Sequence, residues 1–166
     1  RACTTNGIFI LVNSMKPMLI IILVVALASN AVAGIAVIVN RSNPTSDISY
    51  IELKQILEAR KQYWNNNEKI TLIFKPINSS ETHILIDLVF KTKYDDFEKY
   101  WFLKVYESKV TEFPKILNST GTINILVSEI SGAIAFIGAS EVSKRGNIKI
   151  LKIEGKLPDE DGYPLK

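Results

Sequence analysis

An uninterrupted apolar run from Gly34 up to Asn40, rich in β-branched residues, most limits what this chain can fold into. It ends at the polar cluster 40–44, which predicts a buried strand that leads into a loop. A strand that is apolar on both faces is typical of a parallel sheet with helices packed on each side. The run therefore favours a fold of the α/β class.

Predicted strands and helices alternate along the rest of the chain. Ser49 and Glu52 match a capping box, and apolar residues at helical spacing extend that helix to about Tyr63. A second helix is opened by 78–80, further helices are predicted at 94–105 and 119–129, and strands at 70–74, 115–117, 132–137 and 148–153. This order predicts one α/β domain with a largely parallel sheet flanked by helices.

Another apolar run precedes the predicted domain. Lys16 stands before the run Met18–Ala28, and small residues follow at Ala31 and Ala33. This three-part pattern predicts a signal peptide over residues 15–33, cleaved after Ala33, and hence an exported protein. The run is shorter than the ~20 apolar residues of a membrane-spanning helix, so no stable membrane span is expected after cleavage.

The predicted mature domain covers residues 34–166, and residues 1–14 are interpreted as in-frame sequence upstream of the true initiator. Removal of Arg1 and Lys16 takes two positive charges from a formal net charge of +3, so no nucleic-acid partner is expected. The single cysteine, Cys3, is removed as well. The mature domain then has no disulfide and no thiol chemistry and depends on its apolar core.

Several short segments occur in an order that matches one protein family. They are Ile35–Asn40, Asn43-Pro44, Ile48, Leu53, Ile56-Leu57, Trp64, Ser79-Ser80, Tyr100-Trp101, Gly132–Phe136, Leu151–Gly155 and Tyr163–Leu165. Across nearly the whole predicted mature chain, the sequence resembles the small relatives of the phosphate-binding proteins that serve ABC transporters. These proteins belong to the type II periplasmic binding-protein superfamily.

The resemblance implies a periplasmic solute-binding module with a single lobe of the type II fold. It also implies phosphate or a similar small oxyanion as ligand, and an ABC permease as partner. Two-lobed members of the family close on an oxyanion between their lobes. Residues 34–166 are too few for two full lobes.

The loop at residues 78–83 is the candidate anion site. The first N–H groups of a helix lack partners and its dipole favours negative charge, so a loop that enters a helix can bind an oxyanion. In the larger family this loop tends to read Ser-Gly-Thr-Arg; here Glu81 replaces the small residue and the arginine position falls on Thr82 or His83. The candidate contacts are Ser79, Ser80, Thr82 and His83, with Ser119 and Thr120 as a second loop. The alternative for both loops is helix capping alone.

The sequence contains no motif typical of an enzyme. It has no Gly-x-Ser-x-Gly turn, no phosphate loop that ends in Gly-Lys-Ser/Thr, and no histidine pair at metal-ligand spacing. The protein is therefore expected to be a non-catalytic binding protein without a cofactor or a metal site.

Two alternatives to a single binding lobe follow from the same residues. Glu81 and the missing arginine favour a ligand-free interaction or accessory protein of the cell envelope that keeps the binding-protein fold. The short chain also fits a homodimer in which two copies supply the two walls of one cleft.

Overall fold

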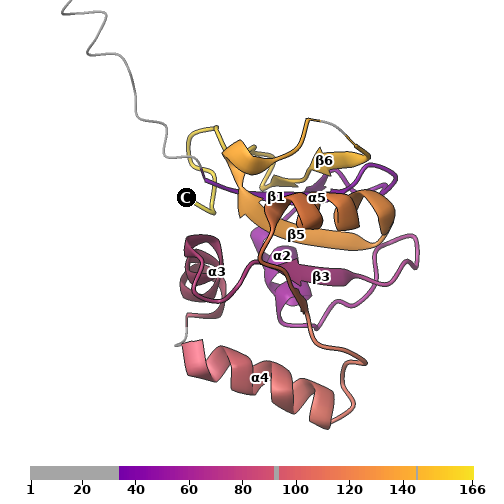
Figure 1. Cartoon of the computed structure of the whole chain (residues 1–166), viewed down its shortest axis with the longest axis vertical. Helices are drawn as coiled ribbons and strands as arrows, with labels where there is room; N and C mark the ends of the chain where they lie inside the picture. The colour runs from indigo at the N-terminus through magenta and orange to yellow at the C-terminus, as the bar shows by residue number, and fades with distance from the viewer. Residues whose placement is uncertain (1–33, 92–93, 145) are drawn as a thin grey trace, which may run out of the picture. The chain divides into compact units, whose positions relative to one another are not determined.

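The computed structural model describes residues 34–91, 94–144 and 146–166 (Figure 1). The predicted signal peptide and the segment before it lie outside the described residues. Within the described ranges, no helix is long and apolar enough to cross a membrane.

A five-stranded sheet forms the centre of the domain. In spatial order its strands are β4 (Lys115–Ile116), β3 (Thr71–Phe74), β5 (Ala133–Gly138), β1 (Ile35–Asn40) and β6 (Ile148–Ile150). β3 pairs parallel with both β4 and β5, whereas β1 pairs antiparallel with both β5 and β6. All strands but β1 thus run the same way, which confirms the prediction of a largely parallel sheet.

The reversed strand is the one whose sequence suggested a parallel sheet. Every residue of β1 is buried, as its apolar run predicts. Burial on both faces requires helices on both faces, and it does not require neighbours of the same direction. The apolar run therefore indicated the environment of β1 correctly and contained no information on its direction.

Helices cover both faces of this sheet (Figure 1). They are α2 (Tyr50–Leu57), α3 (Ser80–Leu85), its π-helical continuation η1 (Ile86–Phe90), α4 (Tyr94–Tyr106) and α5 (Thr120–Glu129). Val37 and Val39 pack with the helices α2 to α4, and Ala36 and Ile38 pack with α5. Alternate residues of one strand therefore enter two separate core clusters.

Helix α2 begins as predicted and ends earlier than predicted. Ser49 caps it by accepting a hydrogen bond from the Glu52 N–H at 3.1 Å. The prediction of a helix up to Tyr63 is wrong, because Ala59 adopts a left-handed conformation with φ of 53°. The Arg60 N–H then bonds back to the Gln55 carbonyl at 2.8 Å, which closes the helix end.

The predicted last strand, 148–153, is two strands. β6 completes the main sheet, and β7 (Lys152–Ile153) pairs in parallel with β2 (Asp47–Ile48) in a separate two-stranded sheet. Neither β2 nor the short 3-10 helix η2 (Ala139–Glu141) was expected from the sequence.

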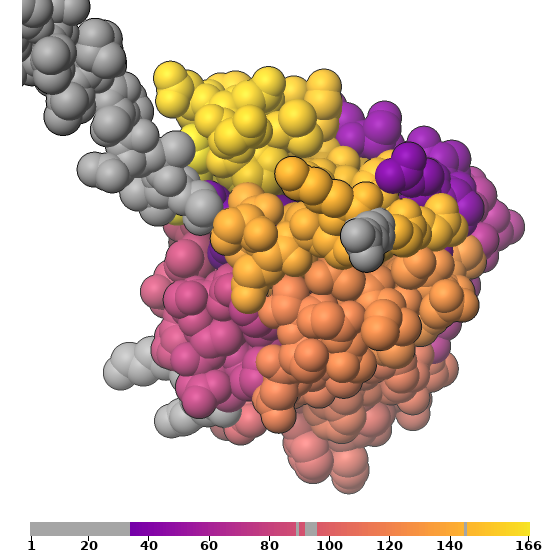
Figure 2. Space-filling view, turned by 45° about the horizontal axis from the view of Figure 1, so that its top comes forward, coloured from indigo at the N-terminus to yellow at the C-terminus, as the bar shows by residue number. Residues whose placement is uncertain are grey.

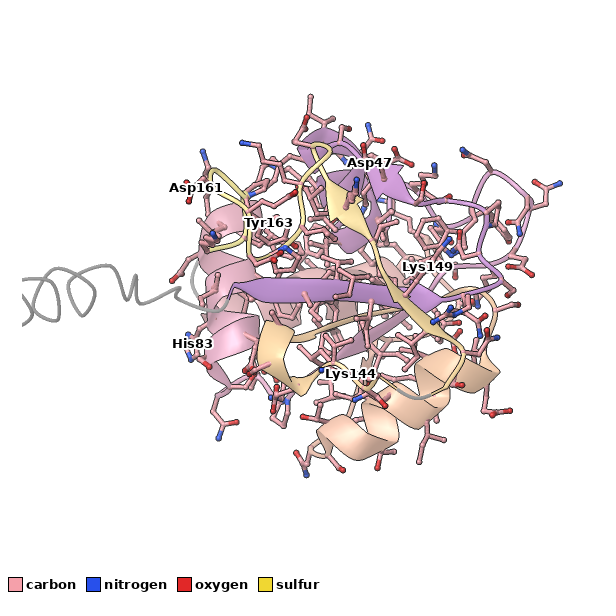
Figure 3. All side chains as sticks on the ribbon, turned by 90° about the horizontal axis from the view of Figure 1, so that it is seen from above. Asp47, His83, Lys144, Lys149, Asp161 and Tyr163 are labelled. Atoms are coloured by element: carbon pink, nitrogen blue, oxygen red, sulfur yellow. The ribbon has the colours of Figure 1, made fainter. Side chains whose placement is uncertain are left out.

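The C-terminal segment is anchored on the start of β1 (Figure 3). The Tyr163 hydroxyl donates a buried hydrogen bond of 2.8 Å to the Ile35 carbonyl, and the Ile35 N–H donates to the Leu165 carbonyl at 3.0 Å. Burial raises the pKa of Tyr163, so its proton is retained for this bond. Tyr163 and Leu165 therefore belong to the core.

Candidate anion site

Three loops meet at one edge of the sheet because β3, β4 and β5 are parallel neighbours. The carboxyl ends of parallel strands lie at the same edge, where loops into helices gather. β3 leads to α3, β4 leads to α5, and β5 leads to η2. Figure 2 shows the magenta segment of α3 adjoining orange residues from this later part of the chain on one face. Both loops predicted as anion sites therefore lie at this edge.

A triad of charged side chains occupies this edge. Lys75, directly after β3, places its Nζ 2.7 Å from a carboxylate oxygen of Glu81 and 2.7 Å from one of Glu141. Only 13% of the Lys75 side chain is exposed, so most of this side chain is withdrawn from water. With one positive and two negative charges, the triad is formally negative.

The Glu141 carboxylate lies among three donors. One oxygen accepts hydrogen bonds from Lys75 Nζ at 2.7 Å and from the Gly138 N–H at 3.1 Å. The other accepts from Thr120 Oγ1 at 3.1 Å. The donors come from the ends of β3 and β5 and from the first turn of α5, so they surround an oxyanion group that belongs to the protein itself.

Mutual hydrogen bonds and charges shift the pKa values of Lys75 and Glu81. Burial alone would lower the pKa of Lys75, but its bonds to Glu141 and Glu81 outweigh burial and raise the pKa. Burial would raise the pKa of Glu81, but its hydrogen bonds, foremost the one from Lys75, and the Lys75 charge outweigh burial and lower the pKa. The ammonium group and the Glu81 carboxylate are therefore both charged at neutral pH.

The hydroxyl groups of the first predicted loop serve the helix cap. Ser79 Oγ accepts the Thr82 N–H at 3.3 Å and donates to Thr82 Oγ1 at 3.1 Å. Thr82 is buried and donates in turn to the Lys75 carbonyl at 3.0 Å. Ser80 is exposed and donates to Glu81 at 3.2 Å. Among these hydroxyls, that of Ser80 is the accessible one.

The other predicted residues differ in their distance from the triad. His83 is exposed at the outer side of α3 (Figure 3), and no bond joins its side chain to the triad. Ser119 caps α5 by accepting the Thr122 N–H at 3.3 Å. Thr120 contacts the triad directly through Glu141. The structure therefore brings Ser80, Thr82 and Thr120 to one place and leaves His83 apart.

Sequence reasoning missed Lys75 and Glu141. Lys75 could have been found, because it directly follows the predicted strand 70–74 and so must lie at the carboxyl edge. Glu141 could not, since it lies on an unpredicted 3-10 helix. In the part of the chain that the structure describes, no group of three or more histidine, cysteine or carboxylate residues could hold a metal ion.

Comparison with known proteins bears on the fold. No protein-family model matches the sequence, and no curated protein matches it significantly. Among solved structures, the chain is similar to an ABC-type phosphate transport receptor from Vibrio cholerae, with 21% identity and a TM-score of 0.59, over 79% of this chain and 53% of the receptor.

Two further solved structures agree. A phosphate ABC transporter substrate-binding protein from Clostridium perfringens, solved with bound phosphate, matches with 21% identity and a TM-score of 0.58, over 74% of this chain and 45% of its own. PstS from Borrelia burgdorferi matches with 17% identity and a TM-score of 0.56, over 75% of this chain and 49% of its own. The chain thus spans about half the length of these proteins, and over that half it has the fold of the phosphate-binding proteins of ABC transporters.

Proposed function

We propose that this protein is an exported, non-catalytic solute-binding module that takes phosphate or a similar small oxyanion in the periplasm and presents it to an ABC permease. The observation that carries the proposal is the set of donors around Glu141. Lys75, Thr120 and the Gly138 N–H hold a carboxylate, and a carboxylate and a phosphate accept the same kinds of hydrogen bond.

In this proposal the ligand replaces the Glu141 carboxylate. The Glu141 side chain is 36% exposed and sits on the short helix η2, so it has solvent to move into. Lys75 then supplies the positive charge, Ser80 and Thr120 supply hydroxyl donors, and the first N–H groups of α3 and α5 supply further donors. Ser79, Thr82 and Ser119 hold the shape of the two loops.

Glu81 makes the site selective for an oxyanion that still carries a proton. Once Glu141 has left, Lys75 and Glu81 together are neutral, so the site has no excess positive charge for a dianion. A carboxylate accepts hydrogen bonds and donates none. Dihydrogen phosphate is a monoanion with protons to donate to Glu81, whereas sulfate at neutral pH is a dianion with none, and we expect phosphate to bind more tightly.

The proposal is tested by calorimetry on residues 34–166, which contain both core clusters, with phosphate, sulfate and molybdate. Glu141→Gln removes the competing negative charge, and we expect it to raise phosphate affinity by about tenfold, the equivalent of ~1.4 kcal/mol. Glu129→Gln, an exposed carboxylate at the opposite end of α5, is the matched control and should leave affinity unchanged.

Two loss-of-function variants complete the test. Lys75→Met should lower affinity by about tenfold or more, because a hydrogen bond to a charged group contributes ~1.5–3 kcal/mol. Lys152→Met, an exposed lysine in β7, is its control. Ser80→Asp adds a negative charge without removing a cap and should abolish binding. Absence of binding by any of the anions, in the wild type and in Glu141→Gln alike, would refute a solute-binding role and favour an interaction protein of the same fold.

A further inference from the structure

We infer that the oxyanion recognised here carries an apolar substituent, so that the ligand is an organic phosphate or phosphonate with a small aromatic or branched group. This inference rests on the proposed function, because it assigns the rest of the ligand whose anionic group the triad binds. The observation behind it is an apolar pocket that shares two residues, Lys75 and Thr82, with the candidate anion site.

The pocket lies between α4, β3 and β4 and has a volume of about 660 Å³. Small-molecule sites typically measure ~300–1,000 Å³, so this volume is far larger than an inorganic anion requires. Its apolar wall includes Phe74, Phe97, Trp101, Phe102, Phe113 and Ile116. Phe74 and Phe97 meet edge to face at 5.9 Å between ring centroids, so two aromatic rings form one side of the pocket.

Four polar side chains line the pocket, and two of them, Glu98 and Lys99 of α4, are exposed. Lys75 and Thr82 belong to the candidate anion site, so an anionic group near Lys75 would have an apolar space beside it.

The wall of the pocket also exposes apolar side chains to water. Phe102 is 60% exposed, Phe113 47% and Ile116 57%. Burial of apolar surface is favourable, so a ligand that covers these side chains gains affinity that bare phosphate cannot gain. A mostly apolar pocket that includes Lys75 thus matches a molecule with an anionic head and an apolar body.

The test compares two probes by calorimetry on residues 34–166, inorganic phosphate and phenylphosphonate, which shares the oxyanion head and adds one ring. We expect phenylphosphonate to bind at least about tenfold more tightly. Equal or tighter binding of inorganic phosphate would overturn the inference and leave the proposed function intact. Binding of neither probe, in the wild type and in Glu141→Gln, would instead overturn the proposed function and the inference with it.

A pair of matched variants tests whether the ring enters this pocket. Ile116→Ser alters the pocket wall, and Ile125→Ser alters an isoleucine of similar exposure, 57% against 62%, on α5. Ile116→Ser should weaken phenylphosphonate binding by about threefold to tenfold and leave phosphate binding unchanged, and Ile125→Ser should change neither. An equal effect of both variants would overturn the assignment. So would a dimer in light scattering that Ile116→Ser dissociates, because a second copy would then cover the pocket.

Discussion

The two ends of α5 are held by different chemistry. At its C-terminal end, Asn40 donates from Nδ2 to the carbonyls of Val127 at 2.9 Å and Ser128 at 2.8 Å, and its Oδ1 accepts from Asn147 at 3.0 Å. Asn40 is 2% exposed, and all its partners are neutral. At the N-terminal end, Thr120 meets the charged and partly exposed Glu141.

The difference separates a structural contact from an exchangeable one. The last carbonyls of a helix need donors, and a buried amide supplies them permanently. A partly exposed carboxylate among three donors can leave for water, and another oxyanion can take its place. Changes around Asn40 should therefore alter stability alone, and changes around Lys75 and Glu141 should alter both stability and anion affinity.

The largest loss of stability should follow Asn40→Ala. The change removes the donors to Val127 and Ser128, and each buried polar group left unsatisfied costs ~1–3 kcal/mol, so we expect a loss of about 3 kcal/mol. Urea unfolding measures it. Asn147→Ala removes one shared hydrogen bond and should cost about 1 kcal/mol. Equal losses in the two variants, or a changed anion affinity in Asn40→Ala, would contradict the assignment of Asn40 as a purely structural contact.

A smaller, pH-dependent loss should follow Glu81→Gln. The bond from Lys75 lowers the folded-state pKa of Glu81 below its usual 4.5, so the stabilisation is complete above pH 4.5 and is lost as pH falls through the lowered pKa. We expect wild type to exceed the variant by about 1.5 kcal/mol at pH 7, and by less at about pH 3. Urea unfolding at both pH values measures the difference, with Glu129→Gln as the control.

The stabilisation by the triad is also lost at high pH, where Lys75 loses its charge. The carboxylates raise the pKa of Lys75 above its usual 10.5, so its contribution is present below pH 10.5 and is lost as pH rises through the raised pKa. A difference between wild type and Glu81→Gln that stays constant from acidic to alkaline pH would show that Glu81 acts through packing and not through charge.

Most of the fold could be predicted because it depends on local pattern. Apolar runs predicted β1, β3 and β5, and serine caps predicted the start of α2 at the correct residue and the starts of α3 and α5 within the correct loops. The end of α2 was missed because Ala59 adopts a left-handed conformation. Glycine is the residue that usually indicates such a helix end in a sequence, and this position is an alanine. The direction of β1 was missed because strand pairing depends on the whole topology.

The candidate site could be predicted only in part, for a related reason. Ser79 and Ser119 were visible because capping residues have a local signature. The triad joins Lys75, Glu81 and Glu141 over a long stretch of sequence, and only the parallel order of β3, β4 and β5 brings them together. A charged contact of this kind has no sequence signature, and so the central residues of the site came from the structure.

The smallest predicted effect separates capping from anion binding at the N-terminal end of α5. Ser119 Oγ accepts the Thr122 N–H, so Ser119→Ala should lower the free energy of unfolding by about 1 kcal/mol. Because that hydroxyl is engaged in the cap, phosphate affinity should change by less than about threefold.

Ser119→Asp also caps a helix and should keep the stability, since Asp and Ser are comparable N-caps. Its negative charge next to Thr120 should nevertheless weaken phosphate binding. Calorimetry on both variants measures the phosphate affinity, and thermal melts measure the stability. Equal phosphate affinity in Ser119→Asp and wild type would mean that the anion does not approach α5, and would confine the site to Lys75 and the loop before α3.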